Sequence, residues 1–274
     1  MSNLHVQALH VHPVKSVAGT APDEMAVEPW GLSGDRRWAV VDTEGTVITQ
    51  RQQPRLALAA ARPLGGGAVA LSAPGMAELA VEVPEPGPLE PVTLFGKKVE
   101  TVVAASAAAD WFSTYLGVPA RLVHMDDPSV RRPVDPAYAL PGETVSLADA
   151  YPVLLVTLAS LDALNSLIAQ GDHPEEGPLP MNRFRPNIVV SGAEAWAEDG
   201  WRRIAIGDAV FRGVRECGRC IVTTTDQATA ERGKEPLKTL ARHRRIGKSL
   251  AFGRQLVPVR TGTVRVGDEV RVLE

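Results

Sequence analysis

Cysteines, aromatic side chains and long apolar runs are all scarce in this sequence. Only two of its 274 residues are cysteine, too few for the disulfide framework of a small secreted protein. Aromatic residues are 5% of the chain, and no apolar run reaches the ~18 residues that a membrane-spanning helix needs. The first residues lack the basic and apolar segments of a signal peptide. We therefore expect a cytoplasmic protein with no membrane partner.

The chain also lacks a strong excess of charge of either sign. Its 29 basic and 32 acidic residues leave a net charge of −3. Such a balance gives no general electrostatic attraction for nucleic acid, and we expect no nucleic-acid partner. With 45% hydrophobic residues, a chain of this length can form one large domain or two moderate ones, each with a real core.

Short β-prone runs separated by proline and glycine dominate the sequence. In the first half their spacing predicts an antiparallel barrel or sandwich. A helical period begins at Ser106, the expected N-cap, and ends before Gly117. The expected helices lie at 106–116, 158–170 and 235–245, and the expected strands at 4–14, 25–30, 38–42, 46–50, 56–62, 68–71, 79–83, 92–94, 98–103, 121–124, 153–157, 188–192, 201–206, 209–214, 221–225, 250–259, 262–266 and 269–273. These elements predict a β-rich α+β fold, with a domain boundary in the polar loop that begins at residue 126.

Cationic and polar side chains recur at the ends of these expected strands. Lys15 and Ser16 follow the first strand, where an ammonium and a hydroxyl suit a phosphate or another anion. Arg36 follows an aspartate in a glycine-rich turn, where it forms either a surface ion pair or an anion clamp. If the segment 183–185 is extended, Arg183 and Arg185 point to the same side and form a fork for phosphate or carboxylate.

The two cysteines, Cys217 and Cys220, are separated by a glycine and an arginine. A structural zinc site needs about four ligands, which this stretch does not supply. A thioredoxin-like redox pair would open a helix, whereas this pair precedes a β-branched run. Two readings remain open beside these: a pair of inert thiols, and a single reactive or metal-ligating thiolate activated by neighbouring arginines.

Taken together, several stretches resemble the MOSC superfamily, within it the proteins that carry an N-terminal β-barrel module, a group that includes the mitochondrial amidoxime-reducing components. The stretches that carry the resemblance are Pro13-Val14-Lys15-Ser16, Gly34-Asp35-Arg36-Arg37-Trp38, Gln50-Arg51-Gln52-Gln53-Pro54-Arg55-Leu56, Arg183-Phe184-Arg185-Pro186-Asn187, Cys217-Gly218-Arg219-Cys220-Ile221-Val222-Thr223-Thr224-Thr225-Asp226, Lys234-Glu235-Pro236-Leu237 and Val266-Gly267-Asp268. The resemblance implies an N-terminal β-barrel domain at 1–125 and a MOSC domain, also barrel-like, at 126–274.

The resemblance also implies a molybdenum cofactor, in which molybdenum is held on the dithiolene of molybdopterin. It makes Cys220 the metal ligand and the catalytic residue, since a soft thiolate suits such a centre. Cys217 becomes a neighbour without a ligand role. The implied cofactor contacts are Lys15, Ser16, Arg36, Arg185, Asn187 and Arg219. Because these residues come from both halves of the chain, the cofactor is expected between the halves.

The function implied by the resemblance is reduction of small N-hydroxylated compounds by two-electron removal of oxygen. The chain has no further cysteines for an iron–sulfur cluster, so we expect a separate electron donor of the ferredoxin, flavin or cytochrome type. Two other functions stay open: a carrier or sulfur-transfer protein for the molybdenum cofactor that uses Cys220, and a binding protein with a degenerate site. Pyridoxal phosphate binding is a further association that the resemblance raises.

Overall fold

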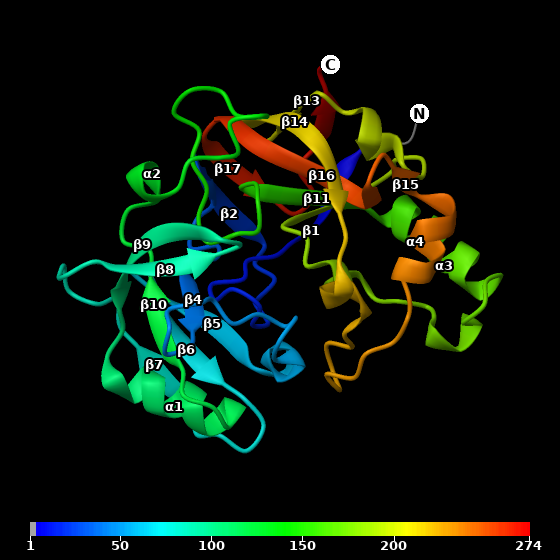
Figure 1. The fold of residues 1–274 in the computed structure, drawn as a ribbon. Helices are drawn as coiled ribbons and strands as arrows, with labels where there is room; N and C mark the ends of the chain where they lie inside the picture. Colours follow the sequence, from blue (N-terminus) through cyan, green and yellow to red (C-terminus); the bar gives the residue numbers. More distant parts are fainter. Residues whose placement is uncertain (1–3) are drawn as a thin grey trace.

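One sheet joins the two ends of the chain. The computed structural model describes residues 4–274, and its largest sheet runs in the order β1-β12-β11-β16-β14-β13-β18, with β15 paired to β16 (Figure 1). The strands are β1 (His5–Leu9), β11 (Val153–Thr157), β12 (Ile188–Ser191), β13 (Arg203–Ile206), β14 (Ala209–Gly218), β15 (Arg245–Ile246), β16 (Ser249–Arg260) and β18 (Val270–Val272). A bridge from His5 to Glu269 connects the two edges, so the sheet closes almost into a barrel.

The N-terminal strands thus contribute to the barrel of the C-terminal half. A small antiparallel sheet continues this arrangement, in the order β17-β2-β3. Its strands are β2 (Glu24–Glu28), β3 (Gly31–Leu32) and β17 (Gly262–Arg265). Val27, Leu32 and Val264 bury their side chains in the same apolar cluster as the barrel strands. The division into domains at 1–125 and 126–274 stays a prediction, and residues 5–32 pair their strands with the second of these segments.

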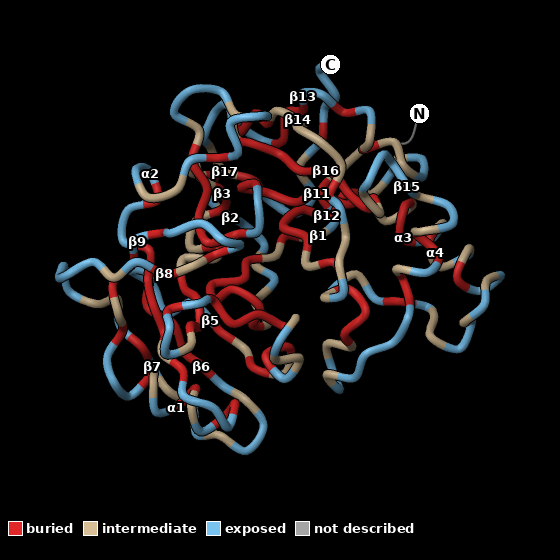
Figure 2. Tube along the Cα trace, in the orientation of Figure 1, coloured by how far each residue is buried: buried red, intermediate tan, exposed pale blue. Residues whose placement is uncertain are grey.

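Two further sheets and a helix form the other half of the molecule. They run β4-β10-β9-β8 and β5-β6-β7, and α1 packs against them (Figure 1). The elements are β4 (Trp38–Val41), β5 (Ala60–Gly65), β6 (Ala68–Ser72), β7 (Leu79–Val81), β8 (Glu90–Leu94), β9 (Lys97–Val103), α1 (Ser106–Leu116) and β10 (Arg121–His124). Trp38 and Phe112 are fully buried in this core, and burying each stabilises the fold by roughly 1.5–3 kcal/mol. Figure 2 shows that buried residues follow the strands of both halves.

Within residues 4–274, three more α-helices follow α1 along the chain. They are α2 (Pro128–Arg131), α3 (Leu158–Ala169) and α4 (Leu237–His243). Thr157 caps α3, because its side chain accepts a hydrogen bond from the Ser160 amide, and Glu198 accepts from both hydroxyls. The predicted α+β, β-rich fold is confirmed. Helix α1 has its predicted bounds and ends at Gly117, whose φ of 70° is left-handed, but its N-cap is Ala105 rather than Ser106.

Three segments predicted as strands have a different structure, and the segment 183–185, whose arginines form a fork only if it is extended, is not extended either. Residues 46–50 form isolated bridges at Thr46 and Val47 rather than a strand, and 54–58 form a 3-10 turn before β5 begins. The other two are next to the cysteines: Met181–Phe184 and Ile221–Thr224 are 3-10 turns. In the latter the hydroxyls of Thr223 and Thr224 donate to carbonyls three residues earlier, which stabilises a turn in a sequence of high strand propensity.

Candidate functional site

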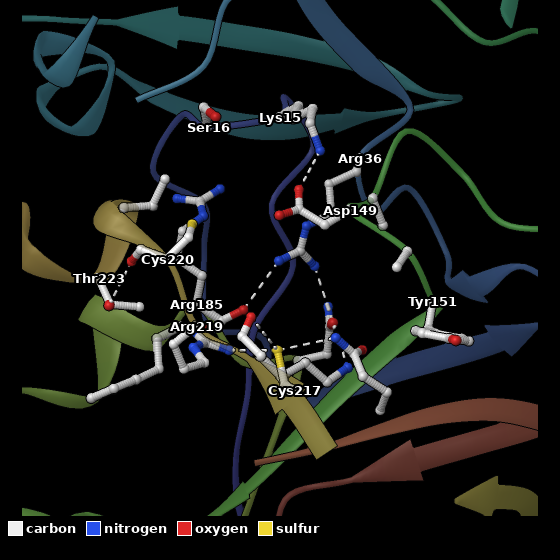
Figure 3. Close-up of a pocket in the computed structure, with 18 of the residues that line it drawn as sticks. Lys15, Ser16, Arg36, Asp149, Tyr151, Arg185, Cys217, Arg219, Cys220 and Thr223 are labelled. Atoms are coloured by element: carbon white, nitrogen blue, oxygen red, sulfur yellow. Dashed lines mark hydrogen bonds and ion pairs between the residues drawn. The ribbon is translucent and has the colours of Figure 1, made fainter. Parts of the chain in front are cut away.

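A cleft between the two halves gathers residues from seven separate stretches of the chain. Its walls combine turns that follow β1 and β3, the loop before β11, the turn before β12 and the cysteine segment after β14 (Figure 3). The lining includes Lys15, Ser16, Arg36, Arg51, Asp149, Tyr151, Arg183, Arg185, Asn187, Cys217, Arg219, Cys220, Thr223 and Gln255. All seven residues that the sequence singled out are among them.

A chain of ion pairs runs along one wall of the cleft. The Lys15 ammonium donates to Asp149 Oδ1 at 2.5 Å and to the Leu147 carbonyl at 2.8 Å. Arg51 contacts the other carboxylate oxygen of Asp149 at 3.5 Å. Arg132 donates to the backbone carbonyls of 146, 148 and 149, and so fixes the loop that carries the carboxylate. Two cations and one carboxylate therefore share this wall, with Lys15 almost wholly buried and Asp149 facing the open cleft.

A second group of polar residues forms the base of the cleft. Arg36 Nη1 donates to Asp35 and, at 3.0 Å, to the Asn187 side-chain oxygen, while its Nη2 donates to the Arg185 carbonyl at 3.1 Å. The Asn187 side chain also bonds to the backbone at His10 and at Leu154, which ties the end of β1 to β11 and β12. Asn187 therefore acts first as an internal support.

Arg183 and Arg185 do not form the fork that the sequence predicted. The segment is a 3-10 turn that ends with Arg185 in the left-handed conformation, at φ 52°. Arg183 donates to the Thr224 carbonyl at 2.9 Å and to Asp226 at 2.8 Å, so it anchors the segment after the cysteines. Arg185 donates to the Val17 carbonyl at 2.8 Å on the opposite half. The two guanidiniums thus serve different parts of the cleft.

The two cysteines lie in the same cleft with different surroundings. Cys217 is at the end of β14, 8% exposed, and its Sγ accepts hydrogen bonds from Arg219 at 2.9 Å and Gln255 at 3.1 Å. Cys220 precedes the 3-10 turn and is partly exposed, with one donor to its Sγ, Arg51 at 3.2 Å. Both thiols are free. The Cys220 sulfur is therefore the more open of the two to a bound ligand (Figure 3).

Cations greatly outnumber carboxylates along the cleft. Among the lining residues within 4–274, Asp149 is the one carboxylate, against six cations: Lys15, Arg36, Arg51, Arg183, Arg185 and Arg219. Burial lowers the pKa of Lys15 to about 8, although Asp149 opposes that shift. Burial, and after it the Arg36 guanidinium, lower the pKa of Arg185 to about 9. A bound anion relieves this repulsion, so the cleft can hold an anionic group beside a thiol.

The sequence missed two residues of this site. Arg51 is the one described hydrogen-bond donor to the Cys220 sulfur, and Asp149 bridges two cations. Arg51 lay within one of the stretches that carry the resemblance, which was the available signal. Asp149 had none, since a lone aspartate in a loop is common on any surface. The structure assigns Arg219 mainly to its neighbours, because it donates to Cys217 and to the Phe184 carbonyl.

Comparisons with known proteins agree with this architecture. Residues 3–119 match the MOSC N-terminal beta barrel domain, and residues 142–271 match the MOSC domain. The chain is 36% identical to "Mitochondrial amidoxime-reducing component 1" of Homo sapiens, over 98% of this chain and 82% of that protein. It is 33% identical to the protein of the same name from Xenopus laevis, over 97% and 81%. A "Molybdenum cofactor sulfurase" of Oryza sativa subsp. japonica is 28% identical over 92% of this chain and 32% of that protein.

This chain therefore belongs to the MOSC-domain family of the amidoxime-reducing components. The amidoxime-reducing relatives, which match 97–98% of this chain, are named mitochondrial, and the cytoplasmic localisation predicted from the sequence is wrong on that finding. Within residues 4–274, no helix is both long and apolar enough to cross a membrane.

Proposed function

We propose that this protein is a reductase of small N-hydroxylated compounds that depends on a molybdenum cofactor. The observation that carries the proposal is the cleft itself, which sets the accessible Cys220 thiol beside a surplus of cations. The amidoxime-reducing names of the relatives supply the substrate class. Electrons come from a separate donor protein or flavin.

The residues present fit a molybdopterin-type group. A thiolate is the ligand type that soft metal centres bind, and Cys220 offers one toward the cleft, with Arg51 as the one donor to its sulfur among the described residues. A pterin phosphate needs cations and hydroxyls, and Lys15, Ser16 and Arg185 stand together on the adjoining wall. Gln50 donates to the backbone carbonyl of Ser16, and within residues 4–274 no group forms a hydrogen bond with the Ser16 hydroxyl. The hydroxyl is therefore available to a ligand.

In this proposal Cys220 holds the metal, and Lys15, Ser16, Arg36, Arg185, Asn187 and Arg219 position the cofactor. When bound, the cofactor supplies the two electrons and the site that accepts the substrate oxygen. The protein residues orient the reactants. Arg51 fixes the Cys220 sulfur and at the same time contacts Asp149. Asp149, the one carboxylate lining the cleft within 4–274, accepts N–H donors from an amidoxime.

The decisive experiment is metal analysis on protein made in a host that produces molybdopterin. We expect about one molybdenum per chain, pterin fluorescence after oxidation, and turnover of benzamidoxime with an artificial reductant. Wild-type protein without molybdenum under these conditions contradicts the cofactor assignment. Protein that binds molybdenum but does not reduce benzamidoxime contradicts the reductase assignment and supports the cofactor assignment.

A second candidate function is that of a carrier or sulfur-transfer protein in which Cys220 holds a persulfide. The observation that favours it is the similarity to a molybdenum cofactor sulfurase across most of this chain. A carrier exchanges its cofactor readily with an acceptor protein and turns over no N-hydroxylated substrate. Cofactor retention through gel filtration, together with benzamidoxime turnover, therefore decides against it. Pyridoxal phosphate binding stays a prediction from the resemblance.

A further inference from the structure

An exposed aromatic side chain occupies the turn between β8 and β9. Leu94 pairs with Lys97, so the turn consists of Phe95 and Gly96, both with positive φ, at 51° and 77°. Two-residue turns of this kind favour asparagine, aspartate and glycine, because most side chains are strained at positive φ. Phenylalanine here is unfavourable locally, and such residues are found preferentially at functional sites.

The Phe95 ring is also not held by an apolar core. It is 51% exposed, and within residues 4–274 it joins none of the buried apolar clusters. A turn needs no such ring for its stability. The β5–β6 hairpin of the same half carries Leu64, 42% exposed, beside three glycines at its turn. Packing alone therefore does not account for Phe95.

Two cations of the cleft wall hold the ring in place. The Lys15 ammonium lies 5.1 Å from the ring centroid and the Arg51 guanidinium 5.0 Å. Both distances are within the range of cation–π attraction. Arg51 in turn donates to the Cys220 sulfur, and Lys15 to Asp149. One guanidinium thus separates the exposed ring from the thiol, and the β8–β9 turn points toward the middle of the molecule (Figure 1).

We propose that Phe95 is a specificity-determining platform at the mouth of the cleft, and that it selects flat aryl N-hydroxylated substrates over small alkyl ones. The inference rests on the proposed reductase function. The exposed part of the ring stacks on the aryl group, while the N-hydroxylated end enters the cleft toward Cys220 and Asp149. Lys15 and Arg51 hold the platform and take no part in the discrimination.

The test compares benzamidoxime with acetamidoxime, which share the reacting group and differ in the aryl ring. In cofactor-loaded protein, Phe95→Gly should lower the ratio of kcat/KM for the aryl over the alkyl substrate about 3- to 10-fold. Phe95→Tyr should keep the ratio. Leu64→Ala, which truncates an exposed apolar side chain on the β5–β6 hairpin, should leave the ratio unchanged. Glycine accepts the φ of 51°, so Phe95→Gly should melt no lower than the wild type.

A second measurement keeps this inference separate from the proposed function. Benzamide and acetamide are neutral like the amidoximes and differ in the same aryl ring. Their binding, followed by ligand-observed NMR, requires no turnover, and Phe95→Gly should weaken only the binding of benzamide. If the wild type reduces neither amidoxime, the proposed function fails, and the binding of the two amides still tests the platform. An unchanged aryl preference in Phe95→Gly overturns the platform. The platform is also overturned if Phe95→Gly weakens the binding of both ligands equally and loses bound molybdenum, because the ring would then contact the cofactor.

Discussion

The two cysteine neighbourhoods differ although they lie three residues apart. Cys217 ends a strand, is nearly buried, and has two donors on its sulfur from its own half of the molecule. Cys220 begins a turn, is partly exposed, and receives its one described donor from Arg51 on the other half. A satisfied thiol is a structural group, whereas an open one beside cations is available for ligation. Sequence spacing alone cannot make this distinction.

The Cys220 side is also where the charge of the cleft is concentrated. Arg51, Asp149 and Lys15 form a continuous chain of ion pairs from the sulfur to the interior. On the Cys217 side, Arg219 is occupied by the Phe184 carbonyl and lies over the Phe184 ring at 5.4 Å. The cations on the Cys220 side can bind an anion, whereas Cys217 and Arg219 already have hydrogen-bond partners within the protein. The following predictions test that difference.

The largest effect should come from removing the two thiols in turn. Cys220→Ala should reduce turnover by more than about 100-fold and remove the bound molybdenum, because a metal ligand is lost. Cys217→Ala should retain molybdenum and stay within about 10-fold of wild-type turnover, as for a group that acts through neighbours. The measurement is metal content and benzamidoxime turnover on matched preparations. Equal loss in both variants would remove the asymmetry between the thiols.

Next in size is the loss of the arginine on the Cys220 sulfur. Arg51→Met should lower turnover about 10- to 100-fold, since the sulfur loses its hydrogen bond and Asp149 loses one of its cations. Arg55→Met is the matched control, because Arg55 stacks on Tyr115 outside the cleft. It should leave turnover unchanged and alter only the melting temperature. A similar fall in both variants would mean that Arg51 acts through general stability.

The third prediction concerns pH and the Lys15 ammonium. With its pKa near 8 rather than 10.5, Lys15 is charged below about pH 8 and neutral above it. Anion affinity should therefore fall about tenfold between pH 7.5 and 9, since binding favours the charged form. Sulfate keeps its charge over this range and serves as the probe in calorimetry. The unfolded chain binds more protons between pH 8 and 10.5, so the free energy of unfolding should rise with pH across that window.

Lys15→Arg supplies the control for the pH effect. A guanidinium loses its proton at a higher pH than an ammonium, so this variant should lose most of the pH effect. It should keep only the roughly twofold fall in sulfate affinity from pH 7.5 to 9 that Arg185, with its pKa of about 9, contributes. Lys15→Met should bind sulfate weakly at every pH. It should lose the Lys15 part of the rise in unfolding free energy and keep a smaller rise above about pH 9, which comes from Arg185. A wild-type affinity that falls no more than that of Lys15→Arg over the same range would assign the anion site to the arginines alone.

Local patterns predicted most of the strands and α1, because period and turn residues are properties of short segments. The α1 apolar face and the glycine at its end determine its bounds almost alone. The strand predicted at 221–225 was wrong, because the structure of this segment depends on threonine hydroxyls that donate hydrogen bonds to backbone carbonyls three residues earlier. Threonine favours a strand on average and a turn when its side chain replaces a ladder hydrogen bond. Propensity does not separate these two cases.

The residues of the candidate site were predicted from the family resemblance rather than from local patterns. A resemblance that extends along the chain brought Lys15, Arg36, Arg185 and Cys220 together before any fold was known, and the cleft contains all of them. The individual contacts could not be predicted. Asp149 becomes part of the site only because Arg132 holds its loop against Lys15. Such a contact depends on packing between distant segments, for which a single sequence carries no local signal.

The smallest effect should come from the donor on the buried thiol. Gln255→Leu removes the 3.1 Å hydrogen bond to Cys217 and leaves Arg219 on that sulfur. Because one donor remains, we expect stability to change by no more than about 1.5 kcal/mol. Turnover should stay within about threefold, since Cys220 keeps its own donor. Chemical denaturation and benzamidoxime turnover measure the two quantities. If Gln255→Leu lowers turnover as much as Arg51→Met does, Cys217 takes part in the chemistry, and the two cysteines differ only in how much each contributes.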